Sequence, residues 1–189
     1  SFFDALSDPS SGEPQGLQVA RFMVSQAIML AMAGVPGIYV HSLLGSHSWH
    51  DGVALTGHNR TINRQKLDRA SLESELSDPN SLRSQVFGAY SRFLGARSSD
   101  PAFHPYGSHH VLSLDDSVLA LLRISPNRDS RVLCLHNVSD RTRTVHLSPR
   151  NLELPSGAWH DLLAGSTIIV GDAGLTLPML PYAVRWLKA

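Results

Sequence analysis

The sequence changes character near His104, and this change limits the possible fold more than any other feature. Beyond it come short apolar runs rich in valine, leucine and isoleucine, separated by turn-forming Asp, Asn, Pro and Ser residues. The runs are Val111–Leu114, Val118–Ile124, Val132–Val138, Thr142–Leu147, Thr167–Val170 and Ala183–Leu187. Strands this short and closely spaced predict an all-β region over residues 104–189, built as a small antiparallel sandwich.

The preceding residues have an α/β pattern instead. Leu17 to Met32 is apolar on nearly every face, which predicts a buried helix ending at the Gly-x-Pro-Gly break that follows. Gly37 to His41 is a short, nearly continuous apolar run, which is typical of a strand buried on both faces of a parallel sheet. A polar loop from Ser42 to Asn63 follows, and apolar residues at helical spacing then predict a second helix from Asp78 to Ser98.

Composition argues against several functional classes. Lys plus Arg and Asp plus Glu balance at 16 each, so no overall charge favours nucleic acid or an anionic membrane. The single cysteine, Cys134, cannot form an intrachain disulfide; we expect a buried strand residue in a cytoplasmic protein. No apolar stretch is long enough to span a bilayer. The sequence opens at Ser1 without a starting Met or a signal peptide, so we expect a piece of a longer protein.

The loop after the expected strand gathers polar and aromatic side chains. Loops at the carboxyl ends of parallel strands carry the chemistry in barrels and open α/β sheets. His47, His50 and His58 with Asp51 suggest a metal site only weakly, because imidazole spacing alone is not specific. Hydrogen bonding to substrate hydroxyls, or simple loop structure, is the favoured interpretation, and no metal or cofactor is expected. Trp49 either stacks on a sugar ring or packs under the loop.

Several motifs occur in the order found at the C-terminal end of α-amylase superfamily enzymes. Gly34-Val-Pro-Gly-Ile-Tyr39 resembles the start of that family's last barrel strand, and Pro181 to Leu187 the closing strand of its domain C. Gly57-His-Asn-Arg-Thr-Ile-Asn-Arg64 is similar to the Gly-Arg-Asp-Ile-Asn-Arg stretch of sucrose phosphorylases. Segments similar to the sister group that acts on glucosylglycerate begin at Ser1, Arg21 and Gly37. The whole chain thus resembles the C-terminal portion of the sucrose-phosphorylase-like group of glycoside hydrolase family 13.

This resemblance implies a fold and a reaction. Residues 1–103 would be the last part of a (β/α)8 barrel, and residues 104–189 the all-β domain C. The implied reaction is retaining α-glucosyl transfer, in which a carboxylate attacks the anomeric carbon, an acid protonates the leaving oxygen, and an acceptor opens the covalent intermediate. In a phosphorylase that acceptor is inorganic phosphate, the donor is an α-glucoside such as sucrose or glucosylglycerate, and the product is glucose 1-phosphate. The family's catalytic carboxylates lie on earlier strands and nothing here matches their motifs, so the chain alone is expected to be inactive.

The resemblance assigns substrate binding to Arg64, Asn63, Arg60 and His58, and no catalytic residue to this chain. Arg64 would clamp the glucosyl unit at the scissile subsite, because its planar fork of donors suits sugar hydroxyls and anions. The alternative is a surface arginine near the start of a helix. Arg60 would bind phosphate or the acceptor, or would be a solvated loop cation. His58 would bond neutral hydroxyls, and Asn63 belongs to the same Ile-Asn-Arg motif.

The expected protein partners are the rest of the barrel, or another copy of the chain, through the apolar helix Leu17–Met32; no nucleic acid or membrane partner is expected. Two other functions stay open. One is a hydrolase or transglycosidase of the same superfamily. The other is a stand-alone carbohydrate-binding β module, which requires exposed coplanar aromatic side chains; the candidates are Tyr106, Trp159, Tyr182 and Trp186.

Overall fold

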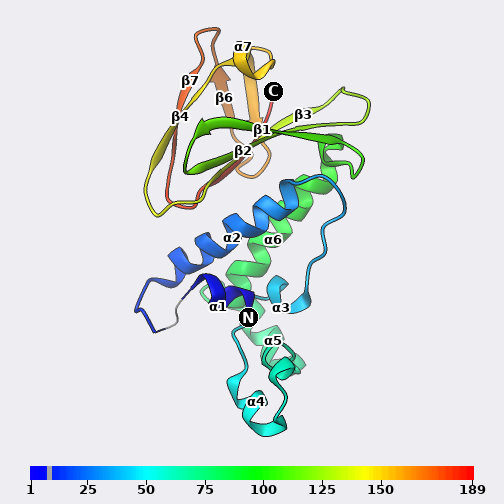
Figure 1. The fold of residues 1–189 in the computed structure, drawn as a ribbon, viewed down its shortest axis with the longest axis vertical. Helices are drawn as coiled ribbons and strands as arrows, with labels where there is room; N and C mark the ends of the chain where they lie inside the picture. The colour runs from blue at the N-terminus through cyan, green and yellow to red at the C-terminus, as the bar shows by residue number, and fades with distance from the viewer. Residues whose placement is uncertain (8–9) are drawn as a thin grey trace. The chain divides into compact units, whose positions relative to one another are not determined.

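The computed structural model describes residues 1–7 and 10–189, and Figure 1 shows the helices and strands. The helical elements before the strands are α1 (Phe2–Leu6), α2 (Gln15–Ala31), α3 (Val40–Leu43), α4 (His50–Thr56), η1 (Asn59–Asn63), α5 (Arg69–Ser77), α6 (Leu82–Ser99) and η2 (Pro101–Phe103). The strands, with one short helix among them, are β1 (Ser108–Asp115), β2 (Val118–Ile124), β3 (Arg131–Asn137), β4 (Arg143–Leu147), α7 (Pro149–Leu152), β5 (Gly157–Asp161), β6 (Thr167–Val170), β7 (Leu175–Met179) and β8 (Val184–Lys188).

The chain divides into two compact units. The helical unit comprises Ser1–Met23 and Gly37–Ser91, and the β-rich unit comprises Val24–Pro36 and Arg92–Ala189. Both long helices, α2 and α6, run from the first unit into the second. The helix predicted at Leu17–Met32 is confirmed as α2, and the antiparallel strands predicted after His104 are confirmed as a group.

An aromatic cluster forms the core of the helical unit. Phe3 is buried, and its ring centroid lies 5.1 Å from that of Phe22 on α2. Phe22, which is also fully buried, makes an edge contact with Tyr90 on α6, with 6.5 Å between ring centroids. Aromatic rings bury large areas and prefer such tilted or edge-on pairs. Three segments far apart in the sequence are therefore joined through one cluster.

The strand predicted at Gly37–His41 is wrong. Tyr39 has the extended backbone expected of a strand (φ −78°, ψ 137°), but it pairs with no strand among the described residues, and α3 begins at Val40. Tyr39 and Val40 are 50% and 53% exposed. A strand depends on hydrogen bonds to a neighbouring strand, and without them an apolar extended run stays a connection.

The region predicted as a loop, Ser42–Asn63, contains α4 and η1, and the short helix α5 after it was not predicted. Asp68 caps α5, because its carboxylate accepts a hydrogen bond from the backbone N–H of Ser71 at 2.9 Å. An Asp in this position before a run of helix-forming residues is a known start signal, so α5 could have been found from the sequence.

Helix α6 starts later than predicted. Asp78 accepts a hydrogen bond from the backbone N–H of Asn80 at 2.9 Å, which holds Asp78, Pro79 and Asn80 in a turn before the helix begins at Leu82. Short side chains such as Asp favour this local bond over helical backbone. The predicted apolar face is otherwise present, since Val86, Tyr90 and Phe93 are buried.

The β-rich unit consists of two antiparallel sheets. One has six strands in the order β1-β2-β3-β8-β5-β6, and the other pairs β4 with β7. Strands β5 and β7 were not predicted as strands; β7 contains Pro178, which argues against an interior strand. Pro178 is tolerated because the sheet has only two strands, so each of them has a free edge.

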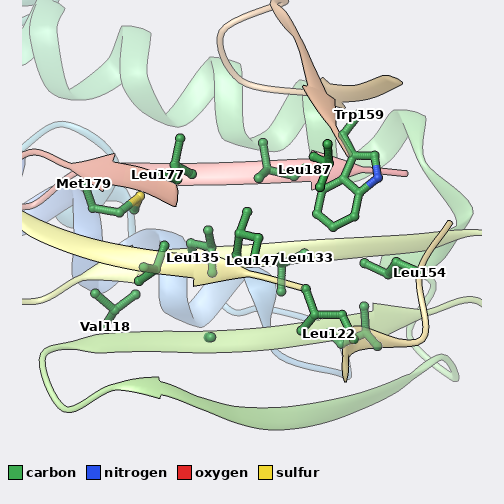
Figure 2. Packing of buried hydrophobic residues seen from close by; sticks show 14 residues of the cluster. Val118, Leu122, Leu133, Leu135, Leu147, Leu154, Trp159, Leu177, Met179 and Leu187 are labelled. Atoms are coloured by element: carbon green, nitrogen blue, oxygen red, sulfur yellow. The ribbon is translucent and has the colours of Figure 1, made fainter. Parts of the chain in front are cut away.

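The apolar core of this unit lies between the two sheets. Figure 2 shows its side chains between the strands, with Trp159 at one end and Met179 at the other. Along β3, Leu133 and Leu135 belong to this core, whereas the alternate residues belong to the opposite face. Period-2 alternation thus assigns each residue of the central strand to one of two buried faces.

Aromatic residues outside the sandwich cover that opposite face. The ring of Trp186 on β8 lies 4.6 Å from that of Phe103 and 5.5 Å from that of Phe93, centroid to centroid. Cys134, paired with Trp186 across β3 and β8, is fully buried, and burial raises the pKa of its thiol strongly. This confirms the interpretation of Cys134 as a structural residue.

One buried carboxylate joins η2 to the sheet. Asp100 accepts hydrogen bonds from Ala102 N at 2.9 Å, Ser130 Oγ at 2.7 Å and Lys188 Nζ at 2.6 Å. Burial acts to raise the pKa of Asp100, but the bonds from Lys188 and Ser130 outweigh it and lower the pKa below its ordinary value. Asp100 is therefore ionised and fully bonded at neutral pH.

The apolar helix α2 is buried along much of its length, in line with the sequence pattern. On α2 the buried apolar side chains are Phe22, Met23, Val24, Ala27, Leu30 and Ala31. Only Met32, beyond its end, is substantially exposed among the large ones. Within the described residues, no helix is both long and apolar enough to cross a membrane.

Candidate substrate-binding site

The predicted site residues lie on the segment that follows α4. Gly57 ends α4 in the left-handed conformation (φ 69°), with its N–H bonded to the carbonyl of Val53 at 2.8 Å. Glycine adopts this conformation without strain, which allows the chain to reverse into η1. The hydroxyl of Thr56 bonds to the carbonyl of Gly52 and to the hydroxyl of Thr61, at 2.8 and 2.9 Å. These bonds fix η1 against the end of α4.

Trp49 packs against α4 and is hydrogen-bonded to η1. A methyl group added to Gly52 would lie 2.1 Å from the indole of Trp49, so the ring rests directly on the glycine. The backbone N–H of Trp49 donates to the carbonyl of Ile62 at 2.9 Å. The half-buried indole therefore packs under the loop, and the structure supports this interpretation of Trp49 over sugar stacking.

Three of the four predicted site residues line one open depression of about 400 Å3. Its walls are Gly57, His58, Asn59, Arg60, Thr61 and Arg64. Arg60 and Arg64 are both exposed, and among the described residues neither guanidinium has a hydrogen-bond or ion-pair partner. Two unpaired guanidinium groups with a histidine in one depression suit hydroxyl-bearing or anionic ligands.

Asn63 is separated from these three residues. Its carbonyl accepts a hydrogen bond of 2.6 Å from the hydroxyl of Tyr39, and it lines a different pocket. The bond ties the end of η1 to the connection before α3. The structure thus gives the backbone of Asn63 a positioning role beside the depression.

That second pocket, of about 90 Å3, is formed by residues that sequence reasoning did not group. It is lined by Ser1, Phe2, Phe3, Tyr39, His41, Ser42, Ser46, His47 and Asn63. In its wall, His47 Nδ1 lies 2.6 Å from a carboxylate oxygen of Asp4, and the other oxygen accepts from Ser48 N at 2.6 Å. Burial acts to raise the pKa of Asp4, but the bonds from His47 and Ser48 outweigh it and hold that pKa below its ordinary value.

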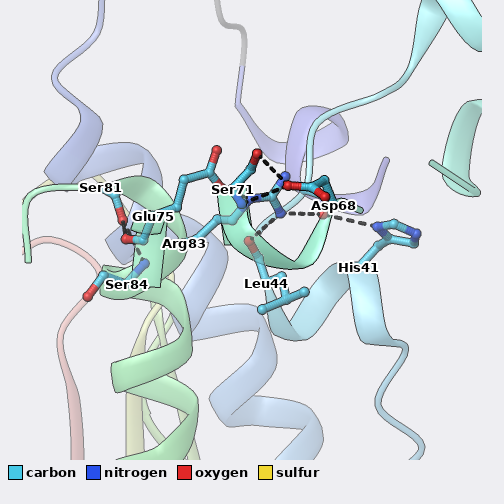
Figure 3. A network of polar contacts seen from close by, with 9 residues as sticks. His41, Leu44, Asp68, Ser71, Glu75, Ser81, Arg83 and Ser84 are labelled. Carbon is cyan, nitrogen blue, oxygen red and sulfur yellow. Dashed lines mark hydrogen bonds and ion pairs between the residues drawn. The ribbon is translucent and has the colours of Figure 1, made fainter. Parts of the chain in front are cut away.

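A polar network holds the second histidine of this pocket. His41 Nδ1 lies 3.0 Å from the hydroxyl oxygen of Ser46, which accepts a bond of 2.8 Å from Arg83 Nη1. Arg83 also forms an ion pair with Glu75, and Figure 3 shows Arg83 between Glu75 and His41. Burial lowers the pKa of His41, and the nearby charge of Arg83 lowers it further. No sequence signal indicated this network, because Arg83 lies on a helix remote from the loop.

The side chains considered for a metal do not converge. His47 is engaged with Asp4, and His58 lines the depression beside Arg60. Over residues 1–7 and 10–189, no group of three or more His, Cys, Asp or Glu side chains is arranged to hold a metal ion.

Comparison with known sequences gives a consistent relationship, although no protein-family model matches the chain. A glucosylglycerate phosphorylase from Spirochaeta thermophila is 50% identical over 139 residues, which is 74% of this chain and 23% of that protein. A glucosylglycerate phosphorylase from Escherichia coli is 33% identical over 189 residues, which is the whole of this chain and 31% of that protein. The chain thus spans about a quarter to a third of the curated relatives that it matches.

Solved structures extend the relationship to the fold. AmyP in complex with maltose superposes on 99% of this chain and 38% of its own, with a TM-score of 0.71 and 15% identity. The α-amylase of Geobacillus thermoleovorans complexed with acarbose covers 90% of this chain and 33% of its own, with a TM-score of 0.68 and 17% identity. At such identity the likeness concerns the fold alone. Sequence and fold together show that the chain belongs to the α-amylase superfamily, glycoside hydrolase family 13, and matches a C-terminal portion of its sucrose-phosphorylase-like group.

Proposed function

We propose that this chain is the C-terminal part of an α-glucoside phosphorylase that transfers a glucosyl group to inorganic phosphate. The observation that carries the proposal is the 50% identity to a glucosylglycerate phosphorylase over 139 residues. Glucosylglycerate is accordingly the first candidate donor and sucrose the second. Glucose 1-phosphate is the product in either case.

The proposed reaction has two steps, and the reacting carboxylates lie outside this chain. In the first, a carboxylate displaces glycerate from the anomeric carbon while an acid protonates the departing oxygen. In the second, a phosphate oxygen attacks the same carbon, releases the carboxylate, and forms glucose 1-phosphate with retained configuration. By itself the chain is therefore inactive.

The depression around η1 is proposed to bind the substrates. Arg64 holds the glucosyl unit through two directed hydrogen bonds, and Arg60 binds phosphate or the acceptor. His58 bonds a neutral hydroxyl, and Asn63 acts through its carbonyl bond to Tyr39. The support is that both guanidinium groups are exposed and free of partners among the described residues.

The proposed roles of the two parts of the chain follow the family's architecture. We propose that residues 1–103 contribute to a (β/α)8 barrel and that residues 104–189 form domain C, which caps it. A stand-alone carbohydrate-binding module is disfavoured, because Trp159 and Trp186 are fully buried and only Tyr106 is widely exposed, at 88%. Association with another copy through α2 and a cytoplasmic location stay predictions.

The test uses the complete protein that contains this chain. It is incubated with glucosylglycerate or sucrose, with and without inorganic phosphate, and glucose 1-phosphate and free glucose are measured separately. The proposal predicts glucose 1-phosphate that depends on phosphate. Release of free glucose at the same rate with and without phosphate would instead identify a hydrolase.

A further inference from the structure

The pocket of about 90 Å3 beside α3 presents two histidines that are held by different partners. His41 is bonded to Ser46, and His47 is bonded to Asp4. Each ring has one nitrogen engaged in these bonds, which leaves the other nitrogen available to a ligand. In each ring, the hydrogen-bond partner of Nδ1 determines whether the other nitrogen, Nε2, carries a hydrogen in the neutral form.

Arg83 determines the hydrogen on His41. A guanidinium only donates, so the hydroxyl oxygen of Ser46 is the acceptor in its 2.8 Å bond with Arg83. Ser46 is buried, and among the described residues the acceptor within reach of its hydroxyl hydrogen is Nδ1 of His41, 3.0 Å away. Nδ1 accepts that hydrogen, so Nε2 of the neutral ring carries the other hydrogen and is a donor. Burial and the charge of Arg83 lower the pKa of His41, which favours the neutral ring.

Asp4 determines which nitrogen of His47 carries the hydrogen, and the result is the opposite of that for His41. An ionised carboxylate only accepts, so Nδ1 of His47 must carry the hydrogen of their 2.6 Å bond. The pKa of Asp4 is held below its ordinary value, as the bonds from His47 and Ser48 outweigh the effect of burial. In the neutral ring of His47, Nε2 is therefore an acceptor.

The charged side chains near the pocket are already paired, and the amino group of Ser1, which also lines the pocket, donates to Ser48 Oγ. Arg83 forms its ion pair with Glu75, and Asp4 is bonded to His47 and to the backbone of Ser48. A ligand thus meets a donor on His41, an acceptor on the neutral form of His47, and no unpaired charge from Arg83, Glu75 or Asp4. Two neighbouring hydroxyls match this arrangement, since one accepts from His41 while the other donates to His47.

We propose that this pocket binds a vicinal diol, with Ser46 and Arg83 as positioning residues for His41 and Asp4 for His47. The volume of about 90 Å3 admits a group of a few heavy atoms, such as one edge of a sugar or a three-carbon polyol. The inference rests on the proposed function in that both substrates considered there, the glucosyl unit and glycerate, contain such a diol.

The test is histidine NMR on the 189-residue chain labelled with 15N-histidine. Before any ligand is added, and at a pH where both rings are neutral, His41 is expected as the Nε2–H tautomer and His47 as the Nδ1–H tautomer. Ser46→Ala is expected to abolish the fixed tautomer of His41 and to leave that of His47 unchanged. The opposite tautomer of His41 in the unchanged chain contradicts the inference.

Three probes then distinguish the ligand: methyl α-D-glucoside, D-glycerate and inorganic phosphate. We expect one of the two diols to shift the resonances of both His41 and His47, and the responding probe identifies the source of the diol. Shifts with phosphate alone, or with neither diol, overturn the proposal. His41→Gln is expected to weaken binding about five- to tenfold, the worth of one neutral hydrogen bond. His110→Gln, an exposed histidine on β1, is the matched control and is expected to change nothing.

Failure of this inference is distinguishable from failure of the proposed function. Phosphate-dependent glucose 1-phosphate formation by the complete protein is measured without reference to this pocket. If that activity is present but neither diol binds at the two histidines, only the pocket assignment is wrong. If a diol binds but the complete protein is no phosphorylase, the proposed function is wrong and the pocket assignment stands.

Discussion

Asn137, at the end of β3, offers the sharpest test of how the two sheets are joined. Its side chain is fully buried. Its Nδ2 lies 2.7, 3.0 and 2.8 Å from the carbonyl oxygens of Arg141, Met179 and Leu180, so its two hydrogens are shared among three acceptors. Its Oδ1 accepts from the backbone N–H of Ser139 at 3.0 Å. One amide thereby fixes the turn before β4 to the segment between β7 and β8.

Replacing Asn137 by Asp keeps the shape and removes the donors. A carboxylate oxygen then faces three carbonyl oxygens, so the bonds of two N–H groups, worth about 1 kcal/mol each, are lost and repulsion is added. An unpaired buried carboxylate adds a desolvation cost, which raises its pKa. We expect a loss of at least about 3 kcal/mol in the free energy of unfolding at pH 7. The loss should shrink at low pH, because protonating the carboxyl removes the buried charge.

The assay is urea unfolding followed by tryptophan fluorescence, since Trp159 and Trp186 are both buried in the β-rich unit. Asn127→Asp is the matched control, because Asn127 is exposed in the turn between β2 and β3; a change below about 0.5 kcal/mol is expected there. A loss below about 1 kcal/mol for Asn137→Asp at pH 7, or a loss no larger than that of the control, would refute the reasoning.

Three further predictions concern other parts of the chain. Gly52→Ala should displace the indole of Trp49 and destabilise the helical unit by about 1–3 kcal/mol, and the Trp49 resonance in 19F-tryptophan NMR should shift. The control is Gly95→Ala, where an added methyl group meets nothing within 4 Å; it should stabilise α6 by about 0.5–1 kcal/mol. An unchanged Trp49 resonance contradicts the packing. Asp100→Asn should lower the unfolding free energy by about 1–3 kcal/mol at pH 7. Because the pKa of Asp100 is lowered in the folded protein, this difference should vanish as pH falls through that pKa in thermal unfolding scans, and a pH-independent difference contradicts the Lys188 pairing. The 189-residue chain alone should release no glucose 1-phosphate from any α-glucoside, and detection of that product overturns the assignment of the carboxylates to residues outside it.

Local sequence patterns were sufficient to predict strands whose pairing partners lie close by in the sequence. The antiparallel strands around Val132 and Val118 alternate between two buried faces and pair with neighbours close in sequence, so their existence was readable. The run at Gly37–His41 carried an equally strong apolar pattern and failed. Its apolar content predicts burial, but strand formation requires a neighbour that no described segment supplies.

The sequence predicted only part of the candidate site, for a related reason. His58, Arg60 and Arg64 are close in sequence and meet in one depression, because η1 brings residues a few positions apart to one face. The pair of oriented histidines was not readable. It depends on Asp4 in α1 and Arg83 in α6, which contact the loop. Contacts between residues so far apart in the sequence cannot be predicted from the spacing of neighbouring residues.

The most direct test of the central claim compares Arg64→Lys with Arg60→Lys in the complete protein. Lysine keeps the charge but loses the planar fork, so Arg64→Lys should slow both glycerate release and glucose 1-phosphate formation by about a hundredfold or more, a loss of a few kcal/mol. Arg60→Lys should mainly slow the phosphate step. Both side chains are exposed, Arg60 in η1 and Arg64 directly after it, so the melting temperature should hardly change for either variant. Near-normal rates for Arg64→Lys, or a loss of activity explained by unfolding, would contradict the assignment of this depression as the glucosyl-binding site.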